Sequence, residues 1–239
     1  MRPPILVTGG SRGIGHATAA SLAADGRHVI RWSRSVRATE GEGKSTDTHI
    51  IDQTVDVSDA ASVTRAVAEL AERCGALSGI VVNAGNGTWA GLAETSNEVW
   101  ARTIGVNLTG AFLTIRSCLP LLMRGRPARV VALASDSAFH PFAGRAAYCA
   151  SKAGLVAMME CLRQEYRASE INVTVVAPAR VDTYFGGKRP GDRPQGLSAA
   201  AVGRSVANVF KQPDEVEVRE IRLASVLDRY GPGDRQEAR

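Results

Sequence analysis

Lysine and aromatic residues are both scarce in this chain. Only four of its 29 basic residues are lysine, and aromatic residues make up 5% of the sequence. Proteins that bind nucleic acid through stacking carry a basic stripe interleaved with aromatic side chains, and no run of five or more like charges occurs here. We therefore expect no nucleic-acid partner, although the net charge is +5.

Paired cysteines and long apolar runs are missing as well. The cysteines lie far apart, without a CxxC pair or a matching histidine cluster, at Cys74, Cys118, Cys149 and Cys161. This spacing excludes the usual zinc sites and indicates reduced thiols, so we expect a cytoplasmic protein with no metal. No stretch of 18 apolar residues occurs, and "ILVTGG" reads as a strand and turn from residue 5. We expect neither a membrane span nor an export signal.

The composition that remains, 44% hydrophobic and 22% charged over 239 residues, is typical of one globular domain spanning residues 1–239. Short β-rich runs alternate with helix-length stretches, a pattern typical of an α/β fold with a doubly wound parallel sheet and helices on both faces. The expected strands are 5–8, 28–32, 49–57, 79–83, 128–134, 172–177 and 216–223. The expected helices are 13–24, 60–73, 97–122, 147–168 and 198–211.

Three stretches are expected to be irregular. Residues 35–48 are polar and predict a solvated loop beside a cofactor. Residues 182–196 contain four glycines and two prolines and predict a mobile lid over the substrate. Residues 228–239 are expected to form a C-terminal tail.

A glycine-rich loop follows the first strand. In "TGGSRGIG", residues 8–15, Gly9, Gly13 and Gly15 stand between a strand and a helix, where a chain without Cβ atoms can turn tightly and approach a pyrophosphate. Spaced glycines suit many strand-to-helix turns, but their position after an N-terminal strand favours a dinucleotide site.

The end of the second strand indicates which dinucleotide is bound. NAD-binding proteins of this kind carry a carboxylate there, whereas "IRWSRS" supplies Ser33 and Arg34. Arg34 and Arg12 offer two guanidinium groups to a 2'-phosphate, and Ser33 a hydroxyl. We expect NADP(H) to be preferred over NAD(H); the alternative is that both arginines are ordinary surface residues.

With these pieces the chain resembles a short-chain dehydrogenase/reductase of the single-domain type, over about residues 4–223. The resemblance is carried by "TGGSRGIG", "DV" at 56–57, "NAG" at 83–85, "VNLTG" around Asn107, "ALASDSA" around Ser135, "YCASK" at 148–152 and "PARVDT" at 178–183. It implies a seven-stranded Rossmann-like sheet. It also implies cofactor contacts from Gly9, Ser11, Arg12, Gly13, Ile14, Gly15, Asp56, Val57, Asn83, Ala84, Gly85, Tyr148, Lys152, Pro178, Val181 and Thr183. For Asn83, an equally good reading is a brace between the central strands.

Tyr148 and Lys152 are spaced four apart, which places them on one face of a helix, one turn from each other. A free phenol has a pKa near 10, and we expect the nearby ammonium to lower the pKa of Tyr148 toward the range useful for proton transfer. The resemblance implies that Lys152 also binds the nicotinamide ribose. A half-buried helix with an extended lysine is the alternative.

Ser135 follows a predicted strand and is expected to hold the substrate oxygen; Ser137, two residues on, is the competing choice. The resemblance assigns Asn107 to a water-bridged relay behind Lys152. We expect a pocket wall made by Phe139, His140, Phe142, Tyr184 and Phe185. Ala179 departs from the family, which usually has glycine after this proline.

These residues predict NADPH-dependent reduction of a carbonyl to an alcohol, with Tyr148 as proton donor and Ser135 as a second hydrogen-bond donor. An alcohol dehydrogenase working in the oxidative direction is the main alternative, and a catalytically silent dinucleotide sensor is another. Two substrate classes stay open: a small molecule with a ring, or one bound to an acyl carrier that meets basic residues at Lys188, Arg189, Arg193, Arg124, Arg126 and Arg129. The family resemblance implies a homo-oligomer, a dimer or a tetramer.

Overall fold

The sheet at the centre of the molecule has seven strands, all parallel, in the order β3-β2-β1-β4-β5-β6-β9. The structure is a computed structural model that describes residues 2–35 and 49–228. The strands are β1 Ile5–Thr8, β2 Val29–Ser33, β3 Ile50–Thr54, β4 Gly79–Val82, β5 Ala128–Leu133, β6 Ile171–Pro178 and β9 Glu220–Leu223. The strand order reverses between β1 and β4, so the predicted doubly wound, Rossmann-like fold is confirmed.

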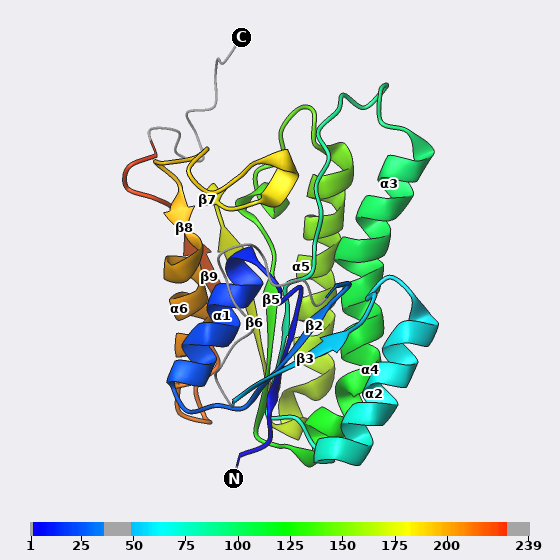
Figure 1. Cartoon of the computed structure of the whole chain (residues 1–239), viewed down its shortest axis with the longest axis vertical. Coiled ribbons are helices and arrows are strands. Elements are labelled where there is room, and N and C mark those ends of the chain that lie inside the picture. Colours follow the sequence, from blue (N-terminus) through cyan, green and yellow to red (C-terminus); the bar gives the residue numbers. More distant parts are fainter. Residues whose placement is uncertain (1, 36–48, 229–239) are drawn as a thin grey trace.

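Helices cover both faces of this sheet (Figure 1). On one face α1 (Gly13–Ala24) packs against α6 (Ala199–Val209). On the other lie α2 (Ala60–Cys74), α4 (Gly110–Arg124) and α5 (Ala146–Tyr166), and α3 (Asn97–Ile104) leads into α4. Local signals explain several ends: the Asp59 carboxylate accepts hydrogen bonds from the first turn of α2, and Gly75 ends it with φ of 68°.

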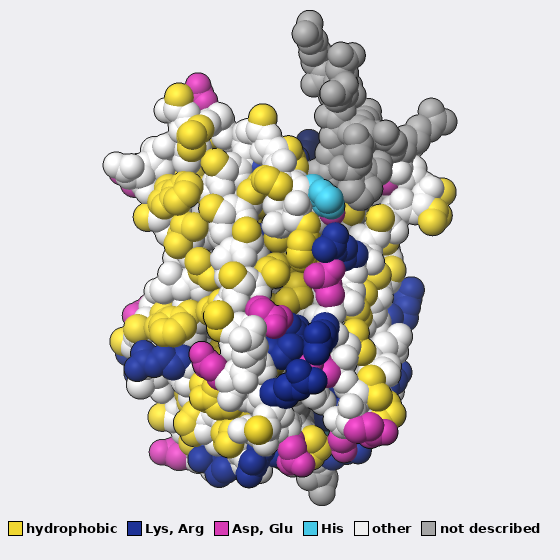
Figure 2. Space-filling model, turned by 180° about the vertical axis from the view of Figure 1, so that it is seen from behind, with side chains coloured by type: hydrophobic (Ala, Val, Ile, Leu, Met, Phe, Trp, Pro, Cys, Tyr) yellow, Lys and Arg dark blue, Asp and Glu magenta, His cyan; other side chains and the backbone are white. Residues whose placement is uncertain are grey.

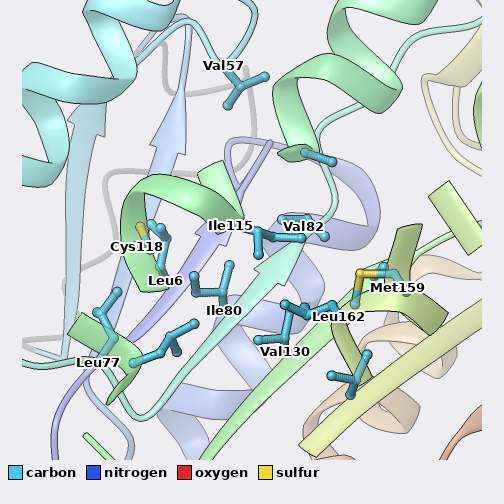
Figure 3. Close-up of a cluster of buried hydrophobic side chains, with 14 of the residues drawn as sticks. Leu6, Val57, Leu77, Ile80, Val82, Ile115, Cys118, Val130, Met159 and Leu162 are labelled. Atoms are coloured by element: carbon cyan, nitrogen blue, oxygen red, sulfur yellow. The ribbon is translucent and has the colours of Figure 1, made fainter. Parts of the chain in front are cut away.

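The core consists of apolar side chains trapped between the sheet and these helices (Figure 3). Ile80 of β4, Val130 of β5, Ile115 of α4 and Met159 of α5 belong to one cluster, and each is almost fully buried. A second cluster joins the other face of the sheet to α1 and α6. Because strands with both faces covered need apolar residues on both sides, the strand sequences read as continuous apolar runs.

The predicted element boundaries needed three corrections. The strands expected at 49–57 and 216–223 are shorter, Ile50–Thr54 and Glu220–Leu223, because they lie at the two edges of the sheet and pair with one neighbour each. The helix expected at 97–122 extends to Arg124 and contains a π-helical turn at Gly105–Thr109. Residues 36–48 of the predicted loop and 229–239 of the predicted tail lie outside the described residues.

The predicted lid has more structure than expected. Two short strands, β7 (Val181–Asp182) and β8 (Leu197–Ser198), pair at its base, and a 3₁₀ turn follows at Phe185–Gly187. Both Asp182 oxygens accept backbone hydrogen bonds, at 2.7 Å from Gly191 N and 3.1 Å from Arg193 N. The segment therefore lies at the carboxyl ends of the strands as a folded loop (Figure 1).

By length and composition alone, one helical segment among the described residues could cross a membrane: 97–124. In this fold it packs against α2 and α5 and contributes Ile115 and Leu122 to the core. Contacts within the protein therefore explain part of its apolar character, while Trp100 and Phe112 remain exposed.

Replacing a central core side chain should be costly. We expect Ile80→Ala to lower the free energy of unfolding by about 2–5 kcal/mol, because it removes buried apolar contacts and leaves a cavity. Leu92→Ala, at a side chain that is 74% exposed, should change it by less than about 0.5 kcal/mol. Urea denaturation of both variants measures the difference, and equal losses would contradict this account of the core.

Candidate active site

A cavity of about 580 Å³ opens at the carboxyl ends of the strands. The glycine-rich loop, the ends of β2, β4 and β5, the first turns of α5 and the lid all contribute to its walls. It thus lies where open parallel sheets bind ligands, at the point where strand order reverses. Most residues predicted from the sequence to touch cofactor or substrate line it; the exceptions are Gly15, Asn107, Phe139 and His140.

The glycine-rich loop is shaped for a close backbone approach. A Cβ atom on Gly9, which has φ of 64°, would lie 2.8 Å from the Ala84 Cα atom, and one on Gly15 would lie 2.3 Å from the Gly9 carbonyl oxygen. At the start of α1, Arg12 makes no side-chain capping hydrogen bond and the first turn has no acidic residue. The backbone amide groups at the start of α1 and the positive end of its helix dipole are suited to a pyrophosphate. The loop therefore fits a dinucleotide.

Asn83 holds this loop against β4. Its side-chain Nδ2 donates to the carbonyl oxygens of Thr8 (2.9 Å) and Gly9 (3.2 Å), and its backbone N donates to Thr8 Oγ1 (3.0 Å). Of the two readings of Asn83, the structure supports the brace between central strands.

Tyr148 and Ser135 meet at the substrate end of the cavity. Tyr148 lies in the first turn of α5, Ser135 directly follows β5, and both side chains are buried. Burial raises the pKa of the Tyr148 phenol above its ordinary value, while its hydrogen bond with Ser135 and the charge of Arg145 oppose the rise. Ser137 also lines the cavity, but it is Ser135 whose side chain contributes to the pKa of Tyr148, in the lowering direction.

Lys152 lies one turn after Tyr148 and is also buried. Its Nζ donates to the Leu133 carbonyl oxygen at 2.6 Å and stands 6.0 Å from the centroid of the Tyr148 ring. Burial lowers the pKa of Lys152 to about 8. The prediction that Lys152 lowers the pKa of Tyr148 is therefore wrong for this structure, because desolvation of the phenolate is the largest effect and Lys152 is not among its causes.

Asn107 lies in the π-helical turn and binds the segment after β4. Its Nδ2 donates to the Asn86 carbonyl oxygen (2.9 Å) and to Ser151 Oγ (3.0 Å), and its Oδ1 accepts from Asn86 N (2.8 Å). Ser151 Oγ in turn donates to the Tyr148 carbonyl oxygen at 2.7 Å. The π-helical turn thus orients the Asn107 amide toward both Asn86 and Ser151. Such turns occur frequently at functional sites.

Comparison with known proteins settles the family. A sequence profile of the short chain dehydrogenase family matches residues 4–193. The chain belongs to this family. A 3-oxoacyl-[acyl-carrier-protein] reductase, MabA of Mycobacterium tuberculosis, is 34% identical over 179 residues, which cover 75% of this chain and 69% of MabA. An uncharacterized oxidoreductase of the same species is 32% identical over 225 residues, or 91% of this chain and 88% of that protein.

Among solved structures, an alcohol dehydrogenase from the archaeon Thermococcus sibiricus, complexed with 5-hydroxy-NADP, superimposes with a TM-score of 0.89. It is 30% identical and covers 97% of this chain and 100% of its own. As a short-chain dehydrogenase, the chain is an NAD(P)-dependent oxidoreductase that acts on CH–OH or C=O groups. The alternative of a catalytically silent sensor is set aside by this enzyme assignment.

Ser33 and Arg34, the residues predicted to meet the adenosine end of the cofactor, both line the cavity. Arg34 is exposed, and its charge helps to hold the pKa of the Asp56 carboxyl below its usual value, after the larger effect of a hydrogen bond from Ser58. Ser33 Oγ donates to the Ser35 carbonyl oxygen at 2.9 Å. The Arg12 guanidinium lies 5.6 Å from the centroid of the Tyr184 ring of the lid, and both Arg12 and Arg34 line the cavity.

The lid end of the cavity brings Pro178, Val181 and Thr183 beside the glycine-rich loop. The methyl group of Thr183 would lie 3.6 Å from a Cβ atom on Gly13. Ala179 stands where the family usually has glycine, and its amide donates to the Leu223 carbonyl oxygen at 2.8 Å. This hydrogen bond continues the pairing of β6 with β9 beyond the end of β6.

The wall of the substrate pocket differs from the prediction. Phe142, Tyr184 and Phe185 line the cavity, but Phe139 and His140 do not. The Phe139 ring instead packs 3.9 Å from the Arg222 guanidinium, and His140 stands 4.0 Å from Asp136. Their place is taken by residues that sequence reasoning missed, Trp89 and Arg145, of which Arg145 could have been noticed as a charge three positions before Tyr148.

Several arginines of the two predicted basic clusters are committed within the protein. Arg193 donates to the carbonyl oxygens of Val181 and Phe185, both at 3.1 Å, and Arg129 is buried and donates to three carbonyls near Pro213. Arg124 donates to the Gly75 carbonyl oxygen at 2.6 Å. On the face shown in Figure 2, acidic side chains lie among the basic ones. Lys188 and Arg189 of the lid stay exposed.

The depressed pKa of Lys152 predicts a pH-dependent stability. An unfolded lysine titrates near 10.5 and the folded one at about 8, so the unfolded chain binds more protons between these values and wild-type stability rises with pH across them. Relative to Lys152→Met, which has no such group, wild type should gain up to about 3 kcal/mol from pH 8 to pH 10.5. Denaturant titrations at both pH values test this; a constant difference would contradict a buried, destabilised ammonium.

Proposed function

We propose that this short-chain dehydrogenase reduces a ketone or aldehyde to an alcohol with NADPH. The observation that carries the proposal is the meeting of Tyr148 and Ser135 in the cavity, with Lys152 one turn away and the glycine-rich loop in the same wall. NADPH, when bound, supplies the hydride.

The side chains of the chain supply the rest of the chemistry. The Tyr148 hydroxyl gives its proton to the oxygen on which negative charge develops, and Ser135 donates a second hydrogen bond to that oxygen. Lys152, held by the Leu133 carbonyl, positions the ribose of the nicotinamide. Asn107 acts behind Lys152 by fixing Ser151 and the Asn86 backbone.

The reductive direction is supported by the raised pKa of Tyr148. A phenol whose pKa lies above its ordinary value stays protonated at neutral pH and is ready to donate, whereas alcohol oxidation needs the phenolate and gains from alkaline pH. Oxidation of an alcohol is the alternative, and the similar protein from Thermococcus sibiricus is an alcohol dehydrogenase by name.

NADP(H) is the proposed coenzyme because no carboxylate ends β2. Arg34 is exposed beside Ser33 at the cavity wall, where a 2'-phosphate can accept from it, and Arg12 lines the same cavity as a second guanidinium. The Thermococcus sibiricus structure contains an NADP derivative, which agrees with this preference.

The substrate class is proposed on the cavity wall. Trp89, Phe142, Tyr184 and Phe185 suit a ring or an apolar chain. MabA is by name an acyl-carrier-protein reductase, and the exposed Lys188 and Arg189 beside the lid suit an acidic carrier. We also propose a cytoplasmic homo-oligomer, dimer or tetramer, in which exposed apolar residues of α3 and α4, Trp100 and Phe112, are covered.

A carbonyl panel tests the activity. Ketones, aldehydes and 3-oxoacyl thioesters should be assayed with NADPH and NADH, and Tyr148→Phe should lower kcat with the best substrate by about 100-fold or more because it removes the proton donor. Ser137→Ala is the matched control and should keep most of the activity. Full activity in Tyr148→Phe would overturn the assignment of the proton donor.

A second experiment tests coenzyme choice. We expect Arg34→Ala to lower the ratio of kcat/KM for NADPH to that for NADH by about 10- to 100-fold, the effect of losing one charge-assisted hydrogen bond. Arg189→Ala, an exposed arginine on the lid outside the cavity wall, should leave the ratio unchanged. A wild-type enzyme that works better with NADH would contradict the preference itself.

A further inference from the structure

Arg145 occupies an unusual place at the start of α5. It is the residue that precedes the helix, three positions before Tyr148, and it lines the cavity while half-buried. Its guanidinium carbon lies 4.2 Å from the centroid of the Trp89 ring and 4.2 Å from that of the Phe142 ring. A flat cation that contacts two ring faces is held in place at little cost in solvation.

The same tryptophan touches the proton donor. The Trp89 ring meets the Tyr148 ring edge-on, with centroids 5.4 Å apart and planes at 88°, and Phe185 of the lid packs on both rings at 5.9 and 5.4 Å. Trp89 and Phe185 therefore pack on the ring of the phenol, and Trp89 shares with Phe142 the contact to the Arg145 guanidinium.

Several other charged groups line the cavity that holds this phenol. Among the described residues these are Lys152, Asp136, Arg193, Arg12, Arg34, Asp56, Arg180 and Asp228. Arg145 and the Cys149 thiol of α5 act on the pKa of Tyr148 through their charge. Arg193 is committed to the Val181 and Phe185 carbonyls. Lys152 has a pKa of about 8, so it loses its charge in the mildly alkaline range, whereas a guanidinium stays charged throughout.

We propose that Arg145 is a positioning residue that acts through Tyr148, its fixed positive charge stabilising the phenolate from the N-terminal side of the tyrosine while Lys152 lies on the C-terminal side. The proposal rests on Tyr148 as the proton donor of the proposed function. The contacts of Arg145 with Trp89 and Phe142 keep a permanent cation at an apolar site. Without that charge, the phenolate would be strongly disfavoured there. The charge of Arg145 lowers the pKa of Tyr148, against the rise caused by burial. This direction agrees with the proposed role of Arg145.

The charge of Arg145 can be tested without any substrate. Tyrosinate absorbs at longer ultraviolet wavelength than tyrosine, and subtracting the spectrum of Tyr148→Phe isolates Tyr148. The full-length protein should be titrated to the highest pH at which circular dichroism shows all variants folded. Arg145→Met keeps an unbranched chain on the two rings but removes the charge, and Arg145→Lys keeps the charge. Arg204→Met, at an exposed arginine of α6 outside the cavity wall, changes the net charge equally.

We expect the ratio of phenolate to phenol at Tyr148, at one fixed alkaline pH, to fall about three- to tenfold in Arg145→Met, which corresponds to a shift of about 0.5 to 1 pH unit. It should stay within about 1.5-fold of wild type in Arg145→Lys and Arg204→Met. An unchanged ratio in Arg145→Met, or an equal fall in Arg145→Lys, overturns the proposal. Arg145→Gln provides a second uncharged variant should the methionine variant not fold.

A kinetic arm separates this inference from the proposed function. With an alcohol substrate and NADP+, the alkaline rise of kcat/KM should move to higher pH by the same amount in Arg145→Met and not in Arg145→Lys. A change of KM at all pH values with no movement of the rise would instead make Arg145 a substrate-binding residue and overturn the proposal. If no substrate is turned over, the proposed function fails, while the spectroscopic titration still decides the role of Arg145.

Discussion

The hydrogen bond from Lys152 Nζ to the Leu133 carbonyl oxygen, 2.6 Å long and buried, is the interaction on which the site depends. It ties one turn of α5 to the last residue of β5. Because Tyr148 lies one turn before Lys152 and Ser135 two residues after Leu133, this contact helps to set the distance between the two groups proposed to bind the substrate oxygen. Met159 and Leu155 of α5 pack on the sheet in the core and hold the helix in this position.

The electrostatics of the site follow from the same burial. Removing Tyr148 and Lys152 from water disfavours the charged form of each, so the pKa of the phenol goes up and that of the ammonium goes down. A protonated phenol suits reduction, but it must still give up its proton, and the groups that ease this are the Ser135 hydroxyl and the Arg145 guanidinium. The protein thus combines an apolar pocket with a few fixed polar groups, which is how buried proton donors are commonly tuned.

Much of this could be read from the sequence. The alternation of apolar runs with helix-length stretches predicted the sheet, and the strands of the interior came out within about two residues because both of their faces are covered. The glycine-rich loop and the Tyr148–Lys152 pair could be recognised in the sequence because the residues of each lie close together along the chain. Errors gathered where distant segments meet: the edge strands β3 and β9, the π-helical turn around Asn107, and the side chains of Phe139 and His140.

The sequence by itself determined the fold class, the glycine-rich loop and the Tyr148–Lys152 pair, since these depend on local spacing and on which residue types are present. Only the tertiary structure decided the sign of the pKa change at Tyr148, the role of Asn83 as a brace, the commitment of Arg193 and Arg129 to backbone carbonyls, and the stacking of Arg145 between Trp89 and Phe142. The physical reason is that burial and through-space charge depend on what surrounds a group, and those neighbours come from segments that lie dozens of residues apart in the chain.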